Sequence, residues 1–292
     1  MKHFKLISLC LLVVFSTSIW AKGSVDTVAV WSASMKKDIK NVVITPEGYD
    51  KDKKATYPVV YLLHGATGAH WNWIKKAPFL PDLATQYGLI IVCPDGDGYS
   101  WYWDSPVDST FRYETYMIEE LVPYIDKNYR TQNARTSRAI CGLSMGGQGA
   151  LYLSWRHQDI FGACASMSGG INIESFPANW NMEKRLGSYA ENPDTWKKFN
   201  VSNMVYLLKP NSIKILIDCG TDDMFYDINC TLHEQLAFRR IPHDFISRPG
   251  NHNWAYWTNS VKYHLLFFDS YFKEEAEKAA KAAAKAAAEK KK

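Results

Sequence analysis

Residues 138–156 read RAICGLSMGGQGALYLSWR, an apolar run followed by a glycine-flanked serine and then a helix-like segment. The five residues from Gly142 to Gly146 match the pattern G-x-S-x-G, and they stand between a predicted strand and a predicted helix. In this setting the serine occupies a strained turn, and the flanking glycines leave room for close backbone packing. The sequence therefore makes Ser144 the candidate nucleophile.

Strand-like runs and helix-like segments alternate on both sides of this stretch. Residues 57–65 (YPVVYLLHG) and 89–96 (LIIVCPDG) are apolar runs that end in glycine, and SIKILIDCG follows later in the chain. Alternation of this kind predicts an α/β fold with a mostly parallel central sheet covered by helices on both faces. The order of the elements is typical of the α/β-hydrolase fold.

Two segments depart from the alternation. Residues 24–56 contain two β-like runs in succession, TVAVWSA and IKNVVITPEGY, which we expect to form antiparallel edge strands. Residues 171–211 are rich in Asn, Trp and Pro and have no clear periodicity. We expect this segment to be a lid-like insertion that shapes the pocket above the site.

The two ends of the chain differ from the middle. Residues 1–21 combine Lys2 and Lys5 with a short apolar run, which predicts a signal peptide. The protein is then secreted or periplasmic, with no stable membrane insertion after cleavage. Residues 22–272 are expected to form the catalytic domain. Residues 273–292 are a low-complexity Ala/Lys/Glu tail with strong helix preference and little apolar surface, so we expect a solvated helix.

The charge is distributed unevenly. The formal net charge is +4, and the lysines that give this positive excess lie mainly in the two terminal segments. A nucleic-acid partner would be expected to require a basic stripe on the folded body. The composition therefore gives no support to nucleic-acid binding.

Five cysteines follow the predicted leader. Four of them stand in apolar strand-like runs, where cysteine behaves as a small buried hydrophobe; they are Cys93, Cys141, Cys164 and Cys219. Buried free thiols are the favoured interpretation, and a bridge from Cys219 to Cys230 stays open.

A serine hydroxyl is a weak nucleophile, so it needs a base and an acid that orients the base, in the order Ser, acid, His for this fold. His252 lies in a loop just past a strand, in RPGNHNW. The other histidines after the serine lie on helical stretches or next to a strand: His157, His233, His243 and His264. Both Asp222 and Asp223 follow the strand ILIDCG, and position alone does not separate them.

The oxyanion donors are predicted from the same fold logic. The backbone N–H of Met145 follows the nucleophile at the start of a helix, where free N–H groups point toward a developing negative charge. The second donor should come from the loop after YLLHG, and there the N–H of Ala66 is the candidate. His64 precedes Gly65 and is expected to shape this loop rather than to act as a base.

Aromatic residues cluster in two loops that should border the pocket. Trp71, Trp101 and Trp103 are the candidates for substrate contact, because aromatic faces stack on sugars and on phenolic acyl groups. The alternative is that several of them pack the core or the lid. No metal motif and no Gly-rich phosphate loop is present in the sequence, so we expect no cofactor.

Several motifs together resemble the putative-esterase family of α/β-hydrolases, which includes feruloyl and acetylxylan esterases, tributyrin esterases and S-formylglutathione hydrolases. The resemblance runs from about residue 57 to residue 272 and rests on YLLHGATG, SWYWDSP, GLSMGGQGAL, CGTDD and PGNHNWAYW. In the family pattern the acid is the last residue of G-x-x-D, which here is Asp223. The family histidine is the one in PG-x-H-x-W, which is His252.

The resemblance implies a secreted serine esterase that hydrolyses carboxylic esters through an acyl-enzyme. Its partner would be a small-molecule or carbohydrate ester, with a short-chain or phenolic acyl group. Two other functions are weighed against this one. The first is acyl transfer to a sugar or alcohol acceptor, because such an acceptor can intercept an acyl-enzyme. The second is a catalytically silent carbohydrate-binding relative.

Overall fold

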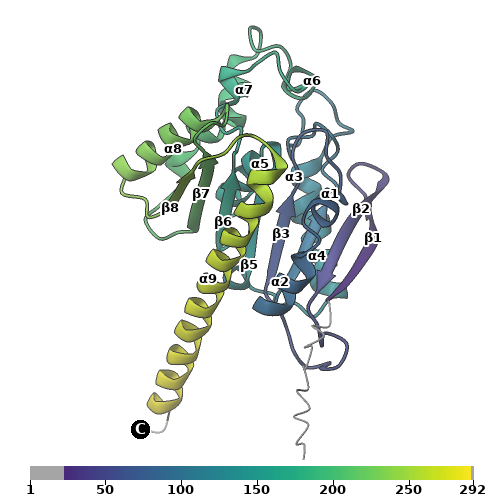
Figure 1. Ribbon diagram of the computed structural model, residues 1–292, viewed down its shortest axis with the longest axis vertical. Helices are drawn as coiled ribbons and strands as arrows, with labels where there is room; N and C mark the ends of the chain where they lie inside the picture. Colours follow the sequence, from purple (N-terminus) through teal and green to yellow (C-terminus); the bar gives the residue numbers. More distant parts are fainter. Residues whose placement is uncertain (1–22, 291–292) are drawn as a thin grey trace, which may run out of the picture.

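The computed structural model describes residues 23–290, which form one sheet, the helices on its two faces and a long C-terminal helix (Figure 1). The signal peptide expected at residues 1–21 lies outside the described residues. Among the residues described, no helix is long and apolar enough to cross a membrane.

The sheet has eight strands in the order β1-β2-β4-β3-β5-β6-β7-β8. The strands are β1 (Ser24–Ser32), β2 (Lys37–Thr45), β3 (Val59–Leu63), β4 (Ile90–Pro94), β5 (Arg138–Leu143), β6 (Ala163–Met167), β7 (Lys214–Gly220) and β8 (Asp244–Arg248). Strand β2 pairs antiparallel with β1 and β4, and every pair from β4 to β8 is parallel. The predicted α/β-hydrolase fold is confirmed. The two N-terminal strands are antiparallel as expected, but only β1 is an edge strand, because β2 lies between β1 and β4.

Nine α-helices accompany the strands in the described part of the chain. They are α1 (Asn72–Lys76), α2 (Leu80–Tyr87), α3 (Tyr113–Thr115), α4 (Val122–Asn128), α5 (Met145–Arg156), α6 (Glu183–Leu186), α7 (Pro193–Phe199), α8 (Tyr226–Phe238) and α9 (Trp254–Glu289). A π-helical segment, η1 (Tyr116–Leu121), joins α3 to α4, and short 3₁₀ turns cover Arg135–Ser137, Ile173–Ser175, Val201–Asn203 and Val205–Leu207.

Two apolar layers hold the helices to the sheet. Successive residues of a strand point to opposite faces, and in β3 Tyr61 and Leu63 join one layer while Val60 and Leu62 join the other. The first layer contains side chains of α4, α5 and α8, and the second contains side chains of α1, α2 and α9. The central strands are buried on both faces, which explains their continuous apolar runs.

The carboxyl ends of the parallel strands lie together at one end of the sheet. The expected insertion, residues 171–211, contains α6 and α7, and Figure 1 shows both helices at the top of the molecule, near the start of α9. Whether it acts as a lid stays a prediction. The five cysteines of the described part are free thiols, four of them buried, so Cys219 and Cys230 are not bridged.

Candidate active site

Ser144 stands at the sharp turn between β5 and α5. Its backbone has φ 54° and ψ −118°, a strained conformation for a residue with a side chain. A Cβ on Gly142 would lie 2.5 Å from the carbonyl oxygen of Gly146, and a Cβ on Gly146 would lie 2.5 Å from that of His64. Both positions therefore require glycine, and the packing around them holds the serine in its strained turn.

Two loops bring an imidazole and a carboxylate to this serine. His252 lies between β8 and α9, and its Nε2 is 2.9 Å from Ser144 Oγ. Its Nδ1 lies 2.9 and 3.0 Å from the two carboxylate oxygens of Asp223, which follows β7. These distances are those of hydrogen bonds. The three side chains thus form a continuous chain from carboxylate to hydroxyl.

The structure distinguishes the two adjacent aspartates that position in the sequence left open. Asp223 is buried, and its Oδ1 also accepts a hydrogen bond of 2.8 Å from the backbone N–H of Phe225. Asp222 is exposed, and its backbone N–H donates to the carbonyl of Gly250. Only Asp223 is therefore hydrogen-bonded to His252.

Aromatic rings fix the His252 imidazole from two sides. The ring of Phe225 meets it edge-on at 5.1 Å, and the ring of Trp257 does so at 4.9 Å. Edge-to-face contacts of this kind are favourable and restrict rotation. The imidazole side chain is 17% exposed, so its Nε2 stays accessible while most of the ring is shielded from water.

The loop after β3 contains Ala66, whose N–H is the second oxyanion donor predicted from the sequence. His64 is buried, its Nε2 accepts a hydrogen bond from the Gly96 N–H at 2.8 Å, and its Nδ1 lies 2.8 Å from the Gly65 carbonyl oxygen. Burial lowers the pKa of His64, which favours the neutral ring with its proton on Nδ1. Because a trans peptide is planar, anchoring the Gly65 carbonyl makes the Ala66 N–H point the opposite way, away from His64.

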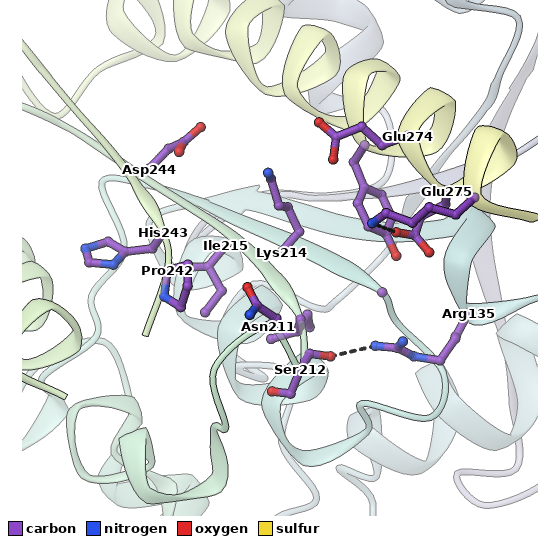
Figure 2. Close-up of a pocket in the computed structure, with 14 residues that line it drawn as sticks. Arg135, Asn211, Ser212, Lys214, Ile215, Pro242, His243, Asp244, Glu274 and Glu275 are labelled. Carbon is purple, nitrogen blue, oxygen red and sulfur yellow. Dashed lines mark hydrogen bonds and ion pairs between the residues drawn. The ribbon is translucent and has the colours of Figure 1, made fainter. Parts of the chain in front are cut away.

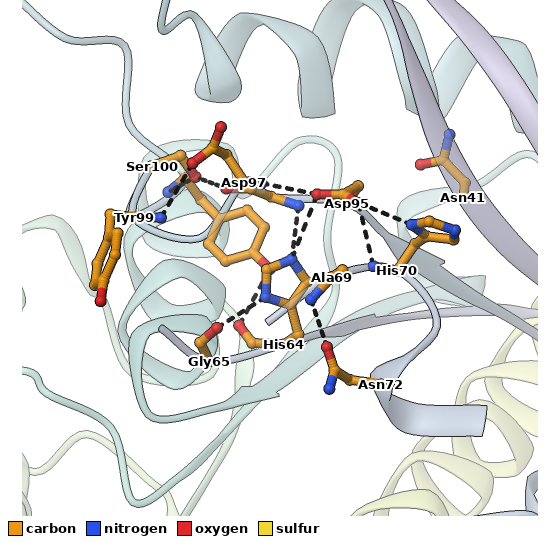
Figure 3. A network of polar contacts seen from close by, with 12 residues as sticks. Asn41, His64, Gly65, Ala69, His70, Asn72, Asp95, Asp97, Tyr99 and Ser100 are labelled. Atoms are coloured by element: carbon orange, nitrogen blue, oxygen red, sulfur yellow. Dashed lines mark hydrogen bonds and ion pairs between the residues drawn. The ribbon is translucent and has the colours of Figure 1, made fainter. Parts of the chain in front are cut away.

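A network of polar contacts connects this loop to the one after β4 (Figure 3). The Nδ1 of His70 lies 2.8 Å from Asp95 Oδ2, and Asp95 Oδ1 accepts from the N–H of Asp97 at 3.0 Å. The N–H of Thr67 donates to the carbonyl of Gly98 at 2.7 Å. The partners come from two different loops, so no local sequence pattern reveals this network.

A cavity of about 300 Å³ opens above Ser144 and His252. Ala66 lines it, as the oxyanion prediction requires, whereas Met145 is buried at the first position of α5. The segment after β3 contributes the polar residues Thr67 and Asn72 to the wall. The aromatic and apolar residues of the wall are Tyr99, Leu143, Trp180, Met224, Trp254 and Trp257. Trp180, which belongs to the insertion, is a pocket residue that the sequence analysis did not name.

The three tryptophans expected to touch substrate occupy other places. Trp101 and Trp103 are 2% and 0% exposed and stack on each other at 5.3 Å, and neither lines the cavity. Both pack in the core, and the indole N–H of Trp101 donates a hydrogen bond of 3.2 Å to the carbonyl oxygen of Trp180. Trp71 is 43% exposed beside Asn72, a residue of the cavity wall, and so stands at the rim.

A second cavity, of about 440 Å³, lies at the opposite end of the sheet, where strands β7 and β8 begin (Figure 2). Lys214 and Asp244, the first residues of β7 and β8, line it together with Arg135 and with Glu274 of α9. Its charges have both signs, and it contains no nucleophile with a paired base. Although this cavity is larger, the hydrogen-bonded pair of Ser144 and His252 lines the cavity of about 300 Å³. Within residues 23–290 no cluster of metal-ligating side chains is present.

The fold and this arrangement place the protein among the α/β-hydrolases. The family model described as "Putative esterase" matches residues 32–268, and the chain belongs to this esterase family. The family predicted from the sequence motifs is thus confirmed.

Individual relatives agree with this assignment. The chain is 30% identical over 238 residues to an esterase of Mycobacterium tuberculosis. The aligned region covers 72% of this chain and 51% of that protein. It is 34% identical over 158 residues to an endo-1,4-beta-xylanase/feruloyl esterase of Xylanibacter ruminicola, 51% of this chain and 22% of that one. The chain therefore spans about half, or less, of these relatives. A solved ferulic acid esterase superposes with a TM-score of 0.75 at 29% identity, over 86% of this chain and 99% of that one.

Proposed function

We propose that this protein is a serine esterase that hydrolyses carboxylic esters with Ser144 as nucleophile, His252 as base and Asp223 as the acid that orients the base. The observation that carries the proposal is the hydrogen-bonded chain from Asp223 through His252 to Ser144 Oγ, with its shortest links at 2.9 Å. A catalytically silent binding protein would have no need of such a chain, and the strain at Ser144 would then serve no purpose.

Acylation is the first half of the proposed reaction. Ser144 Oγ attacks the ester carbonyl carbon while His252 Nε2 takes the hydroxyl proton, and Asp223 stabilises the imidazolium that forms. The carbonyl oxygen becomes an oxyanion, which accepts hydrogen bonds from the N–H groups of Ala66 and Met145. The intermediate then collapses, His252 returns the proton to the leaving alkoxide oxygen, and an alcohol departs from the acylated serine.

Deacylation repeats these steps with water. His252 Nε2 takes a proton from a water molecule as its oxygen attacks the acyl carbon, and the same N–H groups hold the second oxyanion. The bond to Ser144 Oγ breaks, and Oγ receives the proton from His252. A carboxylic acid leaves and the free enzyme is restored, with no need of a cofactor.

The cavity favours short-chain or phenolic acyl esters. A space of about 300 Å³ is at the small end of ligand sites, which suits a short or single-ring acyl group better than a long acyl chain. Trp180 and Trp257 offer ring faces and edges for an aromatic acyl group. The match to a feruloyl esterase segment agrees with this substrate class. The exposed Trp71 at the rim would contact the alcohol side, for example a sugar.

We also propose that the protein is exported. Lys2 and Lys5 precede an apolar run of signal-peptide length. Expression with the native leader should give a mature chain that begins after residue 21 and is recovered from the periplasm or the medium. N-terminal sequencing tests this, and an uncut chain in the cytoplasm would contradict it.

The decisive test compares kcat/KM for methyl ferulate and for p-nitrophenyl butyrate, with the Ser144→Ala protein as blank. We expect Ser144→Ala to lower kcat by on the order of 10³–10⁶-fold with an unchanged circular dichroism spectrum. A preference for ferulate would assign the aromatic wall to the acyl group, and a preference for butyrate would assign it to the alcohol side. A folded Ser144→Ala variant with most of its activity would rule out the proposed nucleophile.

A further inference from the structure

A second buried aspartate lies close to the site, five residues before Asp223. Asp218 is in β7, next to its carboxyl end, and its side chain is 0% exposed. It does not touch Ser144 or His252 through any hydrogen bond of the described residues. A buried carboxylate is costly unless it is paired, so its partners indicate what it stabilises.

The partners of Asp218 come from β8 and from one face of α9. Its carboxylate accepts hydrogen bonds from the Tyr256 hydroxyl and from Arg248 Nη2, the latter at 2.9 Å. The Nε2 of His264 lies 3.5 Å from Oδ2. Arg248 Nη2 also donates to Ser260 Oγ at 2.6 Å. Tyr256, Ser260 and His264 recur every four residues and therefore share one face of the helix.

These contacts keep Asp218 ionised in spite of its position. Burial opposes the charged form, but the nearby His264 imidazole, the hydrogen bond from Tyr256 and the charge of Arg248 outweigh it and hold the pKa of Asp218 below its usual range. The carboxylate therefore carries a negative charge, and the Tyr256 hydroxyl and the Arg248 guanidinium are hydrogen-bonded to it.

The two partners that are hydrogen-bonded to Asp218 stand at the two ends of the loop that carries His252. Arg248 is the last residue of β8, and Tyr256 is in the first turn of α9. His252 lies between them, four residues from each. One carboxylate thus ties down both ends of the segment that presents the base.

The middle of this loop rests on the same tyrosine. A Cβ on Gly250 would lie 2.3 Å from the ring of Tyr256, and a Cβ on Gly220 would lie 2.3 Å from the Gly250 carbonyl oxygen. The N–H of Thr221 donates to the Arg248 carbonyl at 2.9 Å. The loop with His252 is therefore packed directly against the loop with Asp223.

We propose that Asp218 is a positioning residue, which sets the place of His252 by anchoring Arg248 and Tyr256 at the two ends of its loop. This inference rests on the proposed function of the same site. Its physical basis is the steep dependence of rate on geometry: a shift of about 1 Å in a catalytic group costs roughly 10²-fold. Without the carboxylate, Arg248 loses its counter-charge and Tyr256 its acceptor, and the loop between them gains freedom.

Asp218→Asn tests the proposal against a matched control, Glu114→Gln. Glu114 is also a buried carboxylate, and it accepts hydrogen bonds from Tyr152, Arg156 and His157 at 2.7 to 2.8 Å. Its partners lie in and just after the C-terminal half of α5, and none belongs to the His252 loop. Both variants remove one buried charge and one acceptor oxygen, but only Asp218→Asn weakens the anchor of the base.

Two measurements separate positioning from general destabilisation. For Asp218→Asn we expect kcat to fall by about 10- to 100-fold with KM changed less than about threefold. We also expect loss of the downfield proton resonance of the His252 Nδ1–H···Asp223 bond, which is assigned by its absence in Asp223→Asn. Glu114→Gln should lower the melting temperature and leave both kcat and the resonance close to those of the wild type.

The outcomes are distinct. A folded Asp218→Asn protein with wild-type kcat and an intact resonance overturns the proposal, as does an equal loss of kcat in Glu114→Gln at an equal loss of melting temperature. If Asp218→Asn does not fold, Tyr256→Phe removes one hydroxyl from the same anchor, and an unchanged kcat and resonance in it overturns the proposal too. A wild-type protein that hydrolyses no ester would contradict the proposed function instead, and the resonance would still test the anchor.

Discussion

Helix α9 begins in the core of the molecule and ends outside it. From Trp254 to Phe272 it contributes ten buried residues, which pack against the sheet and hold the His252 loop. Every residue from 276 to 290 is exposed. Figure 1 shows this final part of the helix projecting away from the sheet, at the end opposite to α6 and α7. One unbroken helix thus joins a part that is packed against the sheet to a part that is exposed to solvent.

The difference shows that two separate causes make this helix. Its first turns have an apolar face and a capping residue, since the Asn253 side chain accepts from the N–H of Tyr256 at 3.1 Å. Its last turns have only the intrinsic preference of Ala, Lys and Glu. Packing of the first turns against the sheet fixes the geometry of the site. The last turns are helical by propensity alone and do not affect that geometry. Substitutions near the carboxyl edge of the sheet should therefore have large effects, and changes at the end of α9 should have almost none.

The largest effect is expected at the acid. Asp223→Asn should lower kcat by on the order of 10⁴-fold, because an amide no longer holds His252 in the useful tautomer. The matched control is Asp222→Asn, an exposed neighbour with no contact to the imidazole, which should stay within about twofold of the wild type. Steady-state kinetics on p-nitrophenyl butyrate measures both. Equal losses in the two variants would refute the assignment of the acid.

A loss of stability comes next. Trp101→Ala removes a side chain that is 2% exposed and stacks on Trp103, which should cost about 3–5 kcal/mol of unfolding free energy. Urea unfolding followed by tryptophan fluorescence measures it. A loss below about 1 kcal/mol would mean that Trp101 is not part of the packed core and would return it to the candidates for substrate contact.

The pocket wall should respond more mildly. Trp180→Ala enlarges the cavity above Ser144 without touching the hydrogen-bonded chain, so we expect kcat/KM to fall by about tenfold for methyl ferulate and less for p-nitrophenyl butyrate. The kinetics of both substrates in one preparation provide the comparison. A uniform fall in kcat for both esters would indicate that Trp180 positions His252 instead of contacting the acyl group.

The sequence was sufficient for features that depend on local pattern. The strand–serine–helix stretch predicted the turn at Ser144, and strand alternation predicted the mostly parallel sheet. The loop positions of His252 and Asp223 followed from chain order and from the family motifs. These features need only neighbours along the chain, and the structure brings the three side chains within hydrogen-bonding distance.

Features that depend on folding in three dimensions were missed. For Trp101 and Trp103 the sequence left substrate contact and packing open, and only the structure shows them buried against Trp180 and Phe199 of the insertion. Trp180 was hidden in a segment without periodicity. The anchoring of Arg248 and Tyr256 by Asp218 joins residues up to 38 positions apart, and no local signal announces such a contact.

The smallest effect is expected from removal of residues 279–292. All of the described residues in this segment are exposed, so their deletion should change unfolding free energy by less than about 0.5 kcal/mol and leave kcat/KM unchanged. Helical signal in far-ultraviolet circular dichroism should fall, because these turns exist by propensity alone. A drop in melting temperature of several degrees would show instead that the end of α9 packs on a surface, such as a second copy of the chain. In that case packing, and not propensity alone, would stabilise both parts of α9.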